Sequence, residues 1–457
     1  MSTEAIPFEG VEKRLVIQFA RVHEDEALPF GEWSDEGLVK SPLSMSAAEW
    51  QSVLNEACCE VVSEVSQTNR STGEVTRVYL LSESTLTVWK QGFLLKTCGR
   101  TTPFLALKAF LTRYSCSTLD HLNVSWMTYS RLNFLHPEFQ IYPHRTFDEE
   151  QTFATEHFMP LAATLHACSL PAGRFVLHVL FYSRDRPGQQ DLARSETYAT
   201  LSDSARALTS PVSKLSSDPT GCDPSGSDPS GSDPVGSDPP SDDLGYLMNE
   251  VLMTRIRPDC VRCLTGYDNK QERDTSHEQA SVLRDVLAAK SEHNVVDEFW
   301  FDPCGYSANV LFESEDGRHT EYFSTHISPE DCTSYASLEI GSCRPVASLL
   351  KQSQFALEPL VDCFDAQNLN VTRVLIVPSN HQASTHDYPL QTEQDVTTQV
   401  FANTDFTCLI THTASTGSSF IEPTTITRST LKTSEMETSD CVHDISDDWV
   451  RGEQISV

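Results

Sequence analysis

The segment Val75-Thr-Arg-Val-Tyr-Leu-Leu81 leads into Ser82-Glu83-Ser84 and continues as Thr85-Leu-Thr-Val-Trp89. Both flanks are rich in β-branched and apolar residues, and two such runs separated by a short polar turn predict a β-hairpin. A further expected strand, 93–97, ends at Lys96-Thr97-Cys98-Gly99. We therefore expect neighbouring antiparallel strands, with a Glu-Ser bond at the first turn and a cysteine near the end of the third strand.

The Glu83–Ser84 bond has two interpretations. It is either an ordinary turn or a bond that the protein cuts itself, because a serine hydroxyl held against the preceding carbonyl can replace the amide by an ester. Elimination of that ester leaves dehydroalanine, which hydrolyses to a pyruvoyl group. Such a group forms Schiff bases with amines, as pyridoxal phosphate (PLP) does. The tetrapeptide alone does not decide between the two, since Ser-Glu-Ser is common in loops.

Composition narrows the function. A chain of 457 residues holds either two or three domains or one large α/β unit. The net charge of −32 argues against a nucleic-acid partner, which would need clustered Lys and Arg. No apolar run has membrane-spanning length, and no secretory leader is visible, so we expect a cytoplasmic protein with no membrane partner. In that compartment the 14 cysteines should remain thiols.

Only one pair of cysteines has the spacing of metal ligands. Cys260 and Cys263 form a Cys-x-x-Cys motif, but no second pair and no nearby histidine pair accompanies it. A structural zinc site normally needs four ligands. We therefore expect ordinary thiols at these positions and no bound metal.

The remaining pattern predicts an α+β protein. Ser46-Ala-Ala-Glu49 is a capping box that opens a helix. One face of that helix should carry Trp50, Val53, Leu54, Ala57 and Cys58. Further strands are expected at 13–20, 60–66, 175–182, 307–313, 320–327, 334–340 and 372–378, and further helices at 103–113, 280–291 and 346–357. Neighbouring strands with short connections indicate antiparallel sheets with helices outside them.

Two segments do not fit a packed core. Residues 222–241 repeat the unit Ser-Asp-Pro-Ser-Gly with small variations. Such a sequence has too little apolar surface to offset the entropy of ordering it, so we expect 203–243 to be a disordered linker. A binding or phosphorylation segment is the alternative. The Ser- and Thr-rich acidic residues 416–457 are expected to form a disordered tail.

Four further sequence motifs, taken together with the Glu-Ser bond, resemble those of a known protein family. They are Phe8-Glu9-Gly10-Val11-Glu12-Lys13-Arg14-Leu15, Tyr142-Pro143-His144-Arg145, Phe301-Asp302-Pro303-Cys304-Gly305-Tyr306-Ser307 and Thr325-His326-Ile327-Ser328-Pro329-Glu330. In this order, together with the Glu-Ser and Lys-Thr-Cys-Gly motifs, they resemble the eukaryotic S-adenosylmethionine decarboxylases. The resemblance runs from about residue 7 to about residue 413, with one large insertion.

The resemblance implies a fold and a reaction. The fold is a four-layer α/β/β/α sandwich of two antiparallel sheets flanked by helices, with residues 1–202 and 244–415 forming two parts of one sandwich. The proenzyme cuts itself at 83/84, and its β and α chains stay associated. The pyruvoyl group made from Ser84 is the cofactor, with neither metal nor PLP. The substrate is S-adenosylmethionine, and the product donates aminopropyl groups for spermidine and spermine.

The resemblance also assigns chemical roles. Ser84 becomes the pyruvoyl group and Glu83 ends the N-terminal chain. Cys98 is the proton donor in decarboxylation. His326 is the base that removes the α-proton of the ester, a role that suits an imidazole near neutral pH, and Ser307 assists it. Out of context, each of these residues has an ordinary structural interpretation, such as a buried thiol or a hydrogen-bonded histidine.

Other positions correspond to substrate contacts. The rings of Phe8 and Phe301 would sandwich the adenine, for which aromatic faces are suited. Glu330 would hold the ribose hydroxyls, and Leu81 and Glu83 would also line the substrate site. The acidic residues required near the substrate and for processing correspond to Glu9 and Glu12. The plain alternatives are core aromatics and solvated charges.

The chain departs from the family pattern in two places. Arg100 follows Gly99 where a threonine is usual, which puts the rate in doubt. Animal-type relatives bind the activator putrescine in a buried carboxylate cluster, and here Val16 and Gly245 stand where two of the acids are expected. Glu339 remains, and Arg14 resembles plant-type members. A cluster thinned by two charges should bind a dication poorly, so we expect activity that does not depend on putrescine.

Two rival functions stay open at this point. One is a catalytically impaired paralogue that regulates an active decarboxylase subunit, an idea that rests on Thr85, Thr87 and Arg100. The other is a pyruvoyl enzyme for a different amino acid, which Phe8, Phe301 and Glu330 disfavour because they suit a nucleoside. The sequence does not decide whether two copies form a homodimer.

Overall fold

The computed structural model places most of the expected sandwich. The described residues are 9–19, 41–114, 124–158, 163–170, 173–181, 244–257, 293–301, 305–314, 317–329, 334–345, 358–361, 364–378, 396–402 and 406–416. The chain divides into two units, one containing Met1–Tyr182 and Asp243–Val457 and the other Ser183–Asp242. The expected linker at 203–243, the tail beyond 416, the helices at 280–291 and 346–357 and the Cys260–Cys263 pair lie outside the described residues.

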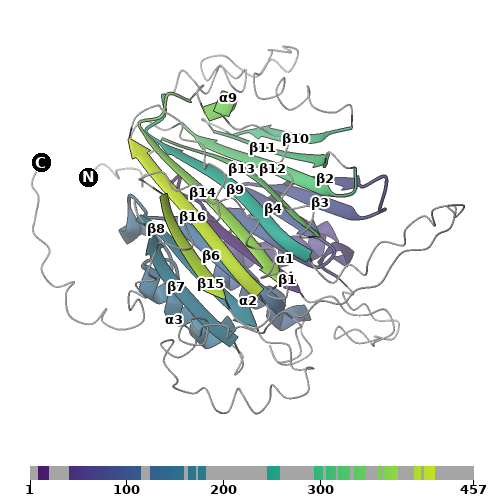
Figure 1. The fold of residues 1–457 in the computed structure, drawn as a ribbon, viewed down its shortest axis with the longest axis horizontal. Helices are drawn as coiled ribbons and strands as arrows, with labels where there is room; N and C mark the ends of the chain where they lie inside the picture. The colour runs from purple at the N-terminus through teal and green to yellow at the C-terminus, as the bar shows by residue number, and fades with distance from the viewer. Residues whose placement is uncertain are drawn as a thin grey trace, which may run out of the picture. The chain divides into compact units, whose positions relative to one another are not determined.

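Sixteen strands of the first unit form two antiparallel sheets (Figure 1). The first sheet contains β1 (Lys13–Phe19), β2 (Val61–Thr68), β3 (Val75–Leu81), β4 (Ser84–Trp89), β5 (Gly92–Thr97), β6 (Val124–Leu132), β7 (Ala163–Leu170) and β8 (Arg174–Phe181). The second contains β9 (Leu244–Thr254), β10 (Val295–Trp300), β11 (Tyr306–Glu313), β12 (Thr320–Ser328), β13 (Tyr335–Pro345), β14 (Asn368–Pro378), β15 (Val396–Ala402) and β16 (Phe406–Thr416).

The two sheets have the same topology. The strand order is β2-β3-β4-β5-β1-β6-β8-β7 in the first and β10-β11-β12-β13-β9-β14-β16-β15 in the second. Adding eight to each number of the first order gives the second. The sequence shows no internal repeat, yet the chain builds the same sheet twice.

The sheets pack against each other because their strands alternate between two apolar faces. Val16 and Leu94 of the first sheet share one buried cluster with Tyr246, Met248 and other residues of the second. In Figure 1 the second sheet, drawn in teal to yellow, lies in front of the first, drawn in purple to blue. The alternate residues of β1, among them Leu15 and Ile17, face the helices instead.

Helices cover the outer face of the first sheet. They are α1 (Ala47–Leu54), α2 (Pro103–Tyr114) and α3 (Phe147–Phe158), accompanied by the 3₁₀ turns η1 (Pro42–Ser44), η2 (Asn55–Ala57) and η4 (Pro137–Phe139). On the outer face of the second sheet, α9 (Glu358–Val361) contributes Leu360 and Val361 to a separate buried cluster. The expected sandwich of two antiparallel sheets flanked by helices is confirmed.

The capping box at Ser46 is confirmed, but one residue of the predicted helix face is wrong. Ser46 Oγ accepts a hydrogen bond from the Glu49 N–H, and Glu49 in turn binds the Ser46 N–H. The helix ends at Leu54, and Cys58 adopts a left-handed conformation with φ 59° that turns its side chain to solvent. Cys59 is the thiol that is buried.

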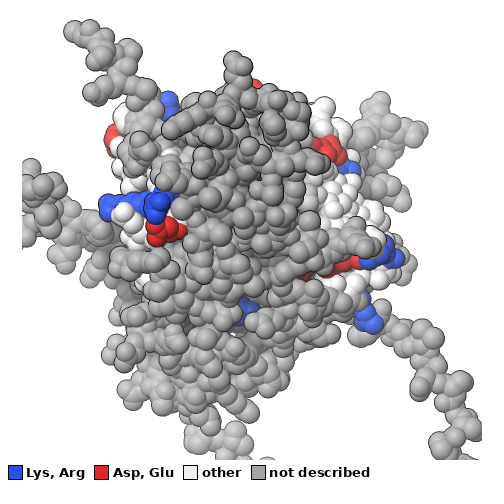
Figure 2. Space-filling view, turned by 90° about the horizontal axis from the view of Figure 1, so that it is seen from above, with Lys and Arg blue, Asp and Glu red and all other residues white. Residues whose placement is uncertain are grey.

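Charges on the described surface are mixed. On the face seen in Figure 2, Lys and Arg side chains lie beside Asp and Glu side chains. Arg70 and Glu313, for example, form a bidentate pair between the two sheets, with N–O distances of 2.6–3.1 Å. No helix of the described part is both long and apolar enough to cross a membrane.

Candidate active site

The Glu83–Ser84 bond lies at the turn between β3 and β4. Ser82 and Glu83 form the turn, and Ser84 pairs with Leu81 as the first residue of β4. Ser82 donates from its N–H to the Glu60 carbonyl at 2.8 Å, and its hydroxyl binds the Glu83 carboxyl. Ser84 has φ 142°, a conformation that favours glycine and costs a side-chain-bearing residue about 1–3 kcal/mol. The backbone is therefore strained at the residue that carries the expected nucleophile.

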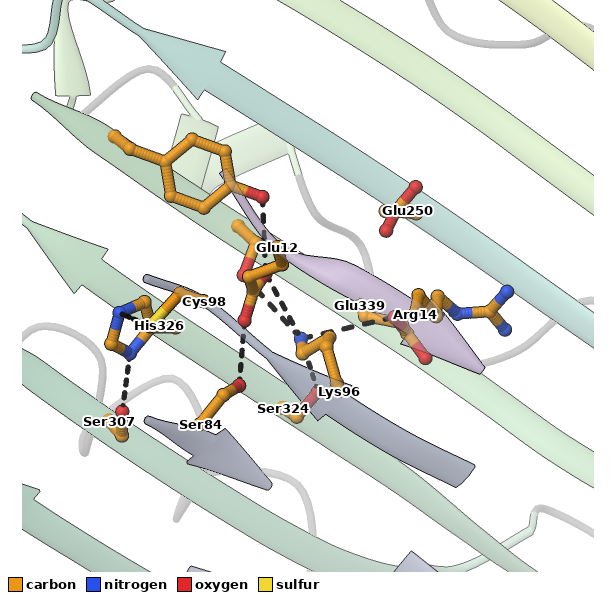
Figure 3. Close-up of polar contacts among 12 residues, drawn as sticks. Glu12, Arg14, Ser84, Lys96, Cys98, Glu250, Ser307, Ser324, His326 and Glu339 are labelled. Carbon is orange, nitrogen blue, oxygen red and sulfur yellow. Dashed lines mark hydrogen bonds and ion pairs between the residues drawn. The ribbon is translucent and has the colours of Figure 1, made fainter. Parts of the chain in front are cut away.

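The hydroxyl of Ser84 is bound to a carboxylate. Ser84 Oγ donates to Glu12 Oε1 at 2.7 Å, and both side chains are buried (Figure 3). The other oxygen, Glu12 Oε2, accepts a hydrogen bond from the Tyr335 hydroxyl at 3.1 Å and lies 3.7 Å from Lys96 Nζ. A serine beside a carboxylate acceptor has the arrangement of a nucleophile with its base.

The carbonyl that this hydroxyl would attack also has partners. Glu83 O accepts from the Cys98 N–H at 2.9 Å and from Cys98 Sγ at 3.1 Å. Two donors on one carbonyl oxygen stabilise the negative charge that develops there in a tetrahedral intermediate. The expected cysteine thus contacts the Glu83 carbonyl, a contact that the sequence does not predict.

A histidine completes the group from the second sheet. His326 of β12 pairs with Ser307 of β11, and His326 Nδ1 lies 2.7 Å from Ser307 Oγ. Its Nε2 lies 3.2 Å from Cys98 Sγ and 3.2 Å from Ser328 Oγ. We call Glu12, Ser84, Cys98, Ser307 and His326 the processing site (Figure 3).

Burial sets the protonation of the two catalytic candidates. It lowers the pKa of His326 to about 4, so the imidazole is neutral and able to accept a proton near pH 7. Burial, with the carboxyls of Glu12 and Glu83, raises the pKa of the Cys98 thiol well above its usual value. Cys98 is therefore a neutral thiol, which suits a proton donor rather than a nucleophile.

Glu9 supports this site through the backbone. Its carbonyl accepts from the Gly99 N–H at 2.8 Å, and its carboxylate accepts from the His136 N–H at 2.9 Å. Lys13 Nζ donates to the Gly99 carbonyl at 2.8 Å. Gly99 has φ 63°, the left-handed conformation that this turn requires. Arg100 is exposed, so the departure from the family pattern adds no buried charge to the site.

The Tyr-Pro-His-Arg block contacts the start of α2, the helix that follows the turn containing Cys98. His144 is buried, with Nδ1 2.9 Å from Glu150 Oε1, and its Nε2 accepts from the Phe104 N–H at 3.4 Å. Burial lowers the pKa of His144 to about 4. Because Phe104 lies in the first turn of α2, the histidine ties the start of that helix to α3.

The expected substrate residues are described only in part. Phe8 and Glu330 lie outside the described residues, so their roles stay predictions. Phe301 is half-buried, with its ring 4.9 Å from that of Phe299. The side chain of Leu81 is fully buried in the core beneath the helices, so only its backbone could meet a ligand. Burial raises the pKa of the Glu83 carboxyl.

A second group of buried charges lies between the sheets. This inter-sheet charge layer consists of Arg14, Lys96, Arg174, Glu250 and Glu339. Arg14 Nε lies 3.1 Å from Glu339 Oε2, and Arg174 Nη2 lies 2.6 Å from Glu250 Oε2. Lys96 donates to Ser324 Oγ at 2.9 Å and lies 3.9 Å from Glu339.

Sequence reasoning missed several of these residues. Lys96 and Lys13 stand inside the Lys-Thr-Cys-Gly and Phe-Glu-Gly motifs, next to residues with an expected role, and this position is a weak indication that they belong to the site. Ser328 also stands inside a quoted motif, two residues after His326, whereas Tyr335 has no such signal. Among the described residues, no three His, Cys, Asp or Glu side chains come together in a way that could hold a metal ion.

Comparison with known proteins gives one family. The family model described as adenosylmethionine decarboxylase matches residues 5–206 and 237–414. A protein of Drosophila melanogaster named S-adenosylmethionine decarboxylase proenzyme is 30% identical over 332 residues, which cover 73% of this chain and 74% of the fly protein.

Plant proteins of the same name are similar over comparable lengths. The protein of Ipomoea nil is 28% identical over 344 residues, covering 74% of this chain and 71% of its own length. That of Catharanthus roseus is 25% identical over 376 residues, covering 81% and 80%. The matched residues include both sheets, except for the last two residues of β16, and every residue of the processing site.

Proposed function

The chain belongs to the adenosylmethionine decarboxylase family of pyruvoyl-dependent carboxy-lyases, and on this premise we propose that it cuts itself at Glu83–Ser84 and then decarboxylates S-adenosylmethionine. The observation that carries the proposal is the geometry of that bond. A strained serine donates to a buried carboxylate, and two donors hold the carbonyl that it would attack.

In the first step, Ser84 Oγ attacks the carbonyl carbon of Glu83. Glu12 Oε1, at 2.7 Å, takes the hydroxyl proton. The N–H and S–H of Cys98 stabilise the oxyanion. When the C–N bond breaks, the Ser84 nitrogen takes up a proton and an ester joins Glu83 to Ser84 Oγ. Relief of the backbone strain at Ser84 favours this direction.

In the second step, His326 removes the α-proton of residue 84. The Cβ–O bond breaks, and Glu83 leaves as a carboxylate at the end of the N-terminal chain. Ser307, at 2.7 Å from His326 Nδ1, holds the imidazole in place, and the neutral state of the ring makes it a base at physiological pH. The dehydroalanine left at position 84 then hydrolyses with loss of ammonia.

The residues around position 84 fit a pyruvoyl group. They are buried and polar and include an acid and a base on two facing sheets. A pyruvoyl group supplies a carbonyl that takes up the electron pair released when carbon dioxide leaves. Cys98, a neutral thiol next to position 84, would deliver the proton to the α-carbon of the substrate.

Binding of S-adenosylmethionine would use residues around this group. Phe8 and Phe301 would stack on the adenine, Glu330 would hold the ribose, and the backbone of Leu81 together with Glu83 would line the site. Glu9 would hold the turn that contains Cys98. The product would donate aminopropyl groups in spermidine and spermine synthesis, in the cytoplasm.

We further propose that putrescine is not needed as an activator. Arg14 forms an ion pair with Glu339, the acid that remains of the expected cluster, and Val16, where another acid is expected, packs in the apolar cluster between the sheets. A diamine would have to displace a guanidinium that is already paired and buried.

The decisive assay is release of labelled carbon dioxide from carboxyl-labelled S-adenosylmethionine. We expect release by the wild-type protein and none by Ser84→Ala, which retains the whole pocket but not the hydroxyl. Release from another amino acid but not from this substrate would favour the second rival. A cleaved protein with no activity on either would favour a regulatory paralogue, which the comparisons do not support.

A further inference from the structure

Tyr335 contacts the processing site from the second sheet and has no role in the mechanism above. It is the first residue of β13 and is 1% exposed. Its ring packs in a small buried cluster with Val11, which precedes β1, and with Leu132 of β6. Its hydroxyl donates to Glu12 Oε2 at 3.1 Å.

The two oxygens of Glu12 have different partners. Oε1 faces the Ser84 hydroxyl at 2.7 Å, whereas Oε2 faces Tyr335 and, further away, Lys96. Glu12 precedes β1 and has no strand partner of its own in either sheet. The direction of its carboxylate is therefore set by side-chain contacts, and the Tyr335 hydroxyl makes the shortest of these on Oε2.

The chemistry of Tyr335 suits a fixed donor. Burial, with the carboxylate of Glu12, raises the pKa of Tyr335 well above its usual value. The hydroxyl therefore stays protonated near neutral pH. A neutral O–H that never ionises can orient a carboxylate without taking or giving a proton.

We propose that Tyr335 is a positioning residue for self-cleavage, whose hydroxyl fixes Glu12 so that Oε1 receives the proton of Ser84 Oγ in the amide-to-ester step. This proposal rests on the proposed self-cleavage. The hydroxyl reaches Glu12 from 323 residues further along the chain. The base is therefore complete only after β13 has packed on the first sheet, which ties cleavage to folding of the second half.

The test isolates the first step. In a His326→Ala background we expect the ester to form but not to be eliminated, and hydroxylamine cuts an ester while leaving an amide intact. We expect Tyr335→Phe in this background to lower the initial rate of appearance of the hydroxylamine-sensitive bond about tenfold, because one hydrogen bond to a charged group is lost. Cell-free synthesis followed by quenching at set times supplies the rate.

A matched control removes a buried hydroxyl elsewhere. Tyr306 of β11 is equally buried, but its hydroxyl donates to Glu298 at 2.9 Å and its ring packs on the outer face of the second sheet. Tyr306→Phe should leave the rate of ester formation unchanged. When His326 is present, the Tyr335→Phe protein should accumulate as the uncut amide chain and not as the ester, because only the first step is slowed.

Replacement of Tyr335 by 4-aminophenylalanine distinguishes loss of the hydrogen-bond donor from a folding defect. This residue keeps the size and an N–H donor and should restore ester formation, whereas 4-methylphenylalanine keeps the size alone and should not. Equal ester rates for Tyr335→Phe and Tyr306→Phe would overturn the proposal and leave the proposed function standing. Absence of any hydroxylamine-sensitive bond in His326→Ala itself would instead contradict the proposed self-cleavage.

Discussion

The processing site and the inter-sheet charge layer lie between the same two sheets, and both are built on buried carboxylates. In the charge layer each carboxylate is matched by a guanidinium: Glu339 by Arg14 at 3.1 Å and Glu250 by Arg174 at 2.6 Å. In the processing site the nearest cation to Glu12 is Lys96 at 3.7 Å, and one oxygen of Glu12 faces a hydroxyl instead.

On the proposed mechanism, this difference separates a structural carboxylate from a reactive one. Arg14 and Lys96 help to lower the pKa of the Glu339 carboxyl, which therefore has little tendency to take a proton, and its removal would leave Arg14 as an unpaired buried charge. A carboxylate held by neutral hydroxyls keeps a lone pair for a proton and stands beside a nucleophile. The same residue type therefore has two roles, decided by the partner on the facing sheet.

The largest expected effect is on the processing site. Glu12→Gln keeps the shape of the side chain but removes the base, so self-cleavage should slow by roughly 10²–10⁴-fold. Gel analysis of the cleaved fraction against time measures this. Cleavage by Glu12→Gln at the wild-type rate would show that Glu12 is not the proton acceptor and that the two carboxylate groups do not differ in the proposed way.

The converse change affects stability. Glu339→Gln leaves Arg14 buried without its partner, which should cost about 3–5 kcal/mol in free energy of unfolding. Urea titration in a Ser84→Ala background, where every chain is uncut, gives that value. Cleavage in the Ser84-containing protein should stay within about threefold of wild type, since Glu339 does not touch the reacting atoms. Loss of cleavage with unchanged stability would reverse the comparison.

The third prediction concerns pH. Burial lowers the pKa of His326 to about 4, so its neutral, basic form persists as the pH falls and is lost only near that value. Elimination of the ester should therefore slow less than about twofold between pH 7.5 and pH 5, whereas a histidine of ordinary pKa would lose about 30-fold. Rates of ester decay after a pH jump distinguish these results. A break in the profile near pH 6.5 would show that the imidazole is accessible to solvent.

The smallest expected effect is that of putrescine. Since Arg14 already neutralises Glu339, added diamine should change cleavage and turnover by less than about twofold. Cleavage and carbon dioxide release are measured with and without the diamine at matched ionic strength. A several-fold rise in turnover would show that the charge layer still binds a dication and would narrow the difference between the two regions.

The sequence predicted the parts of the site that lie within short motifs. The hairpin at Ser84, the cysteine after β5 and the Ser307–His326 pair on adjacent strands all follow from local pattern and the family resemblance, and the structure brings these residues together. The antiparallel sandwich was likewise predicted from alternating strands with short connections.

The rest depends on contacts between distant segments. Arg14 and Glu339 are 325 residues apart, and nothing in either neighbourhood names the other as its partner. The contact between Tyr335 and Glu12 is likewise absent from the local sequence pattern, because it forms only when the two sheets pack together. Cys58 was placed on the wrong side because the periodic pattern continues past the residue where the helix ends. The repeated strand order was invisible because equal topology does not require similar residues.

Self-cleavage at Glu83–Ser84 can be tested by the intact mass of the purified protein under denaturing conditions. The account predicts two chains, one ending at Glu83 and the other beginning with a pyruvoyl group at position 84. Ser84→Ala should give a single chain under the same conditions. A single uncut wild-type chain of 50.9 kDa would contradict the account.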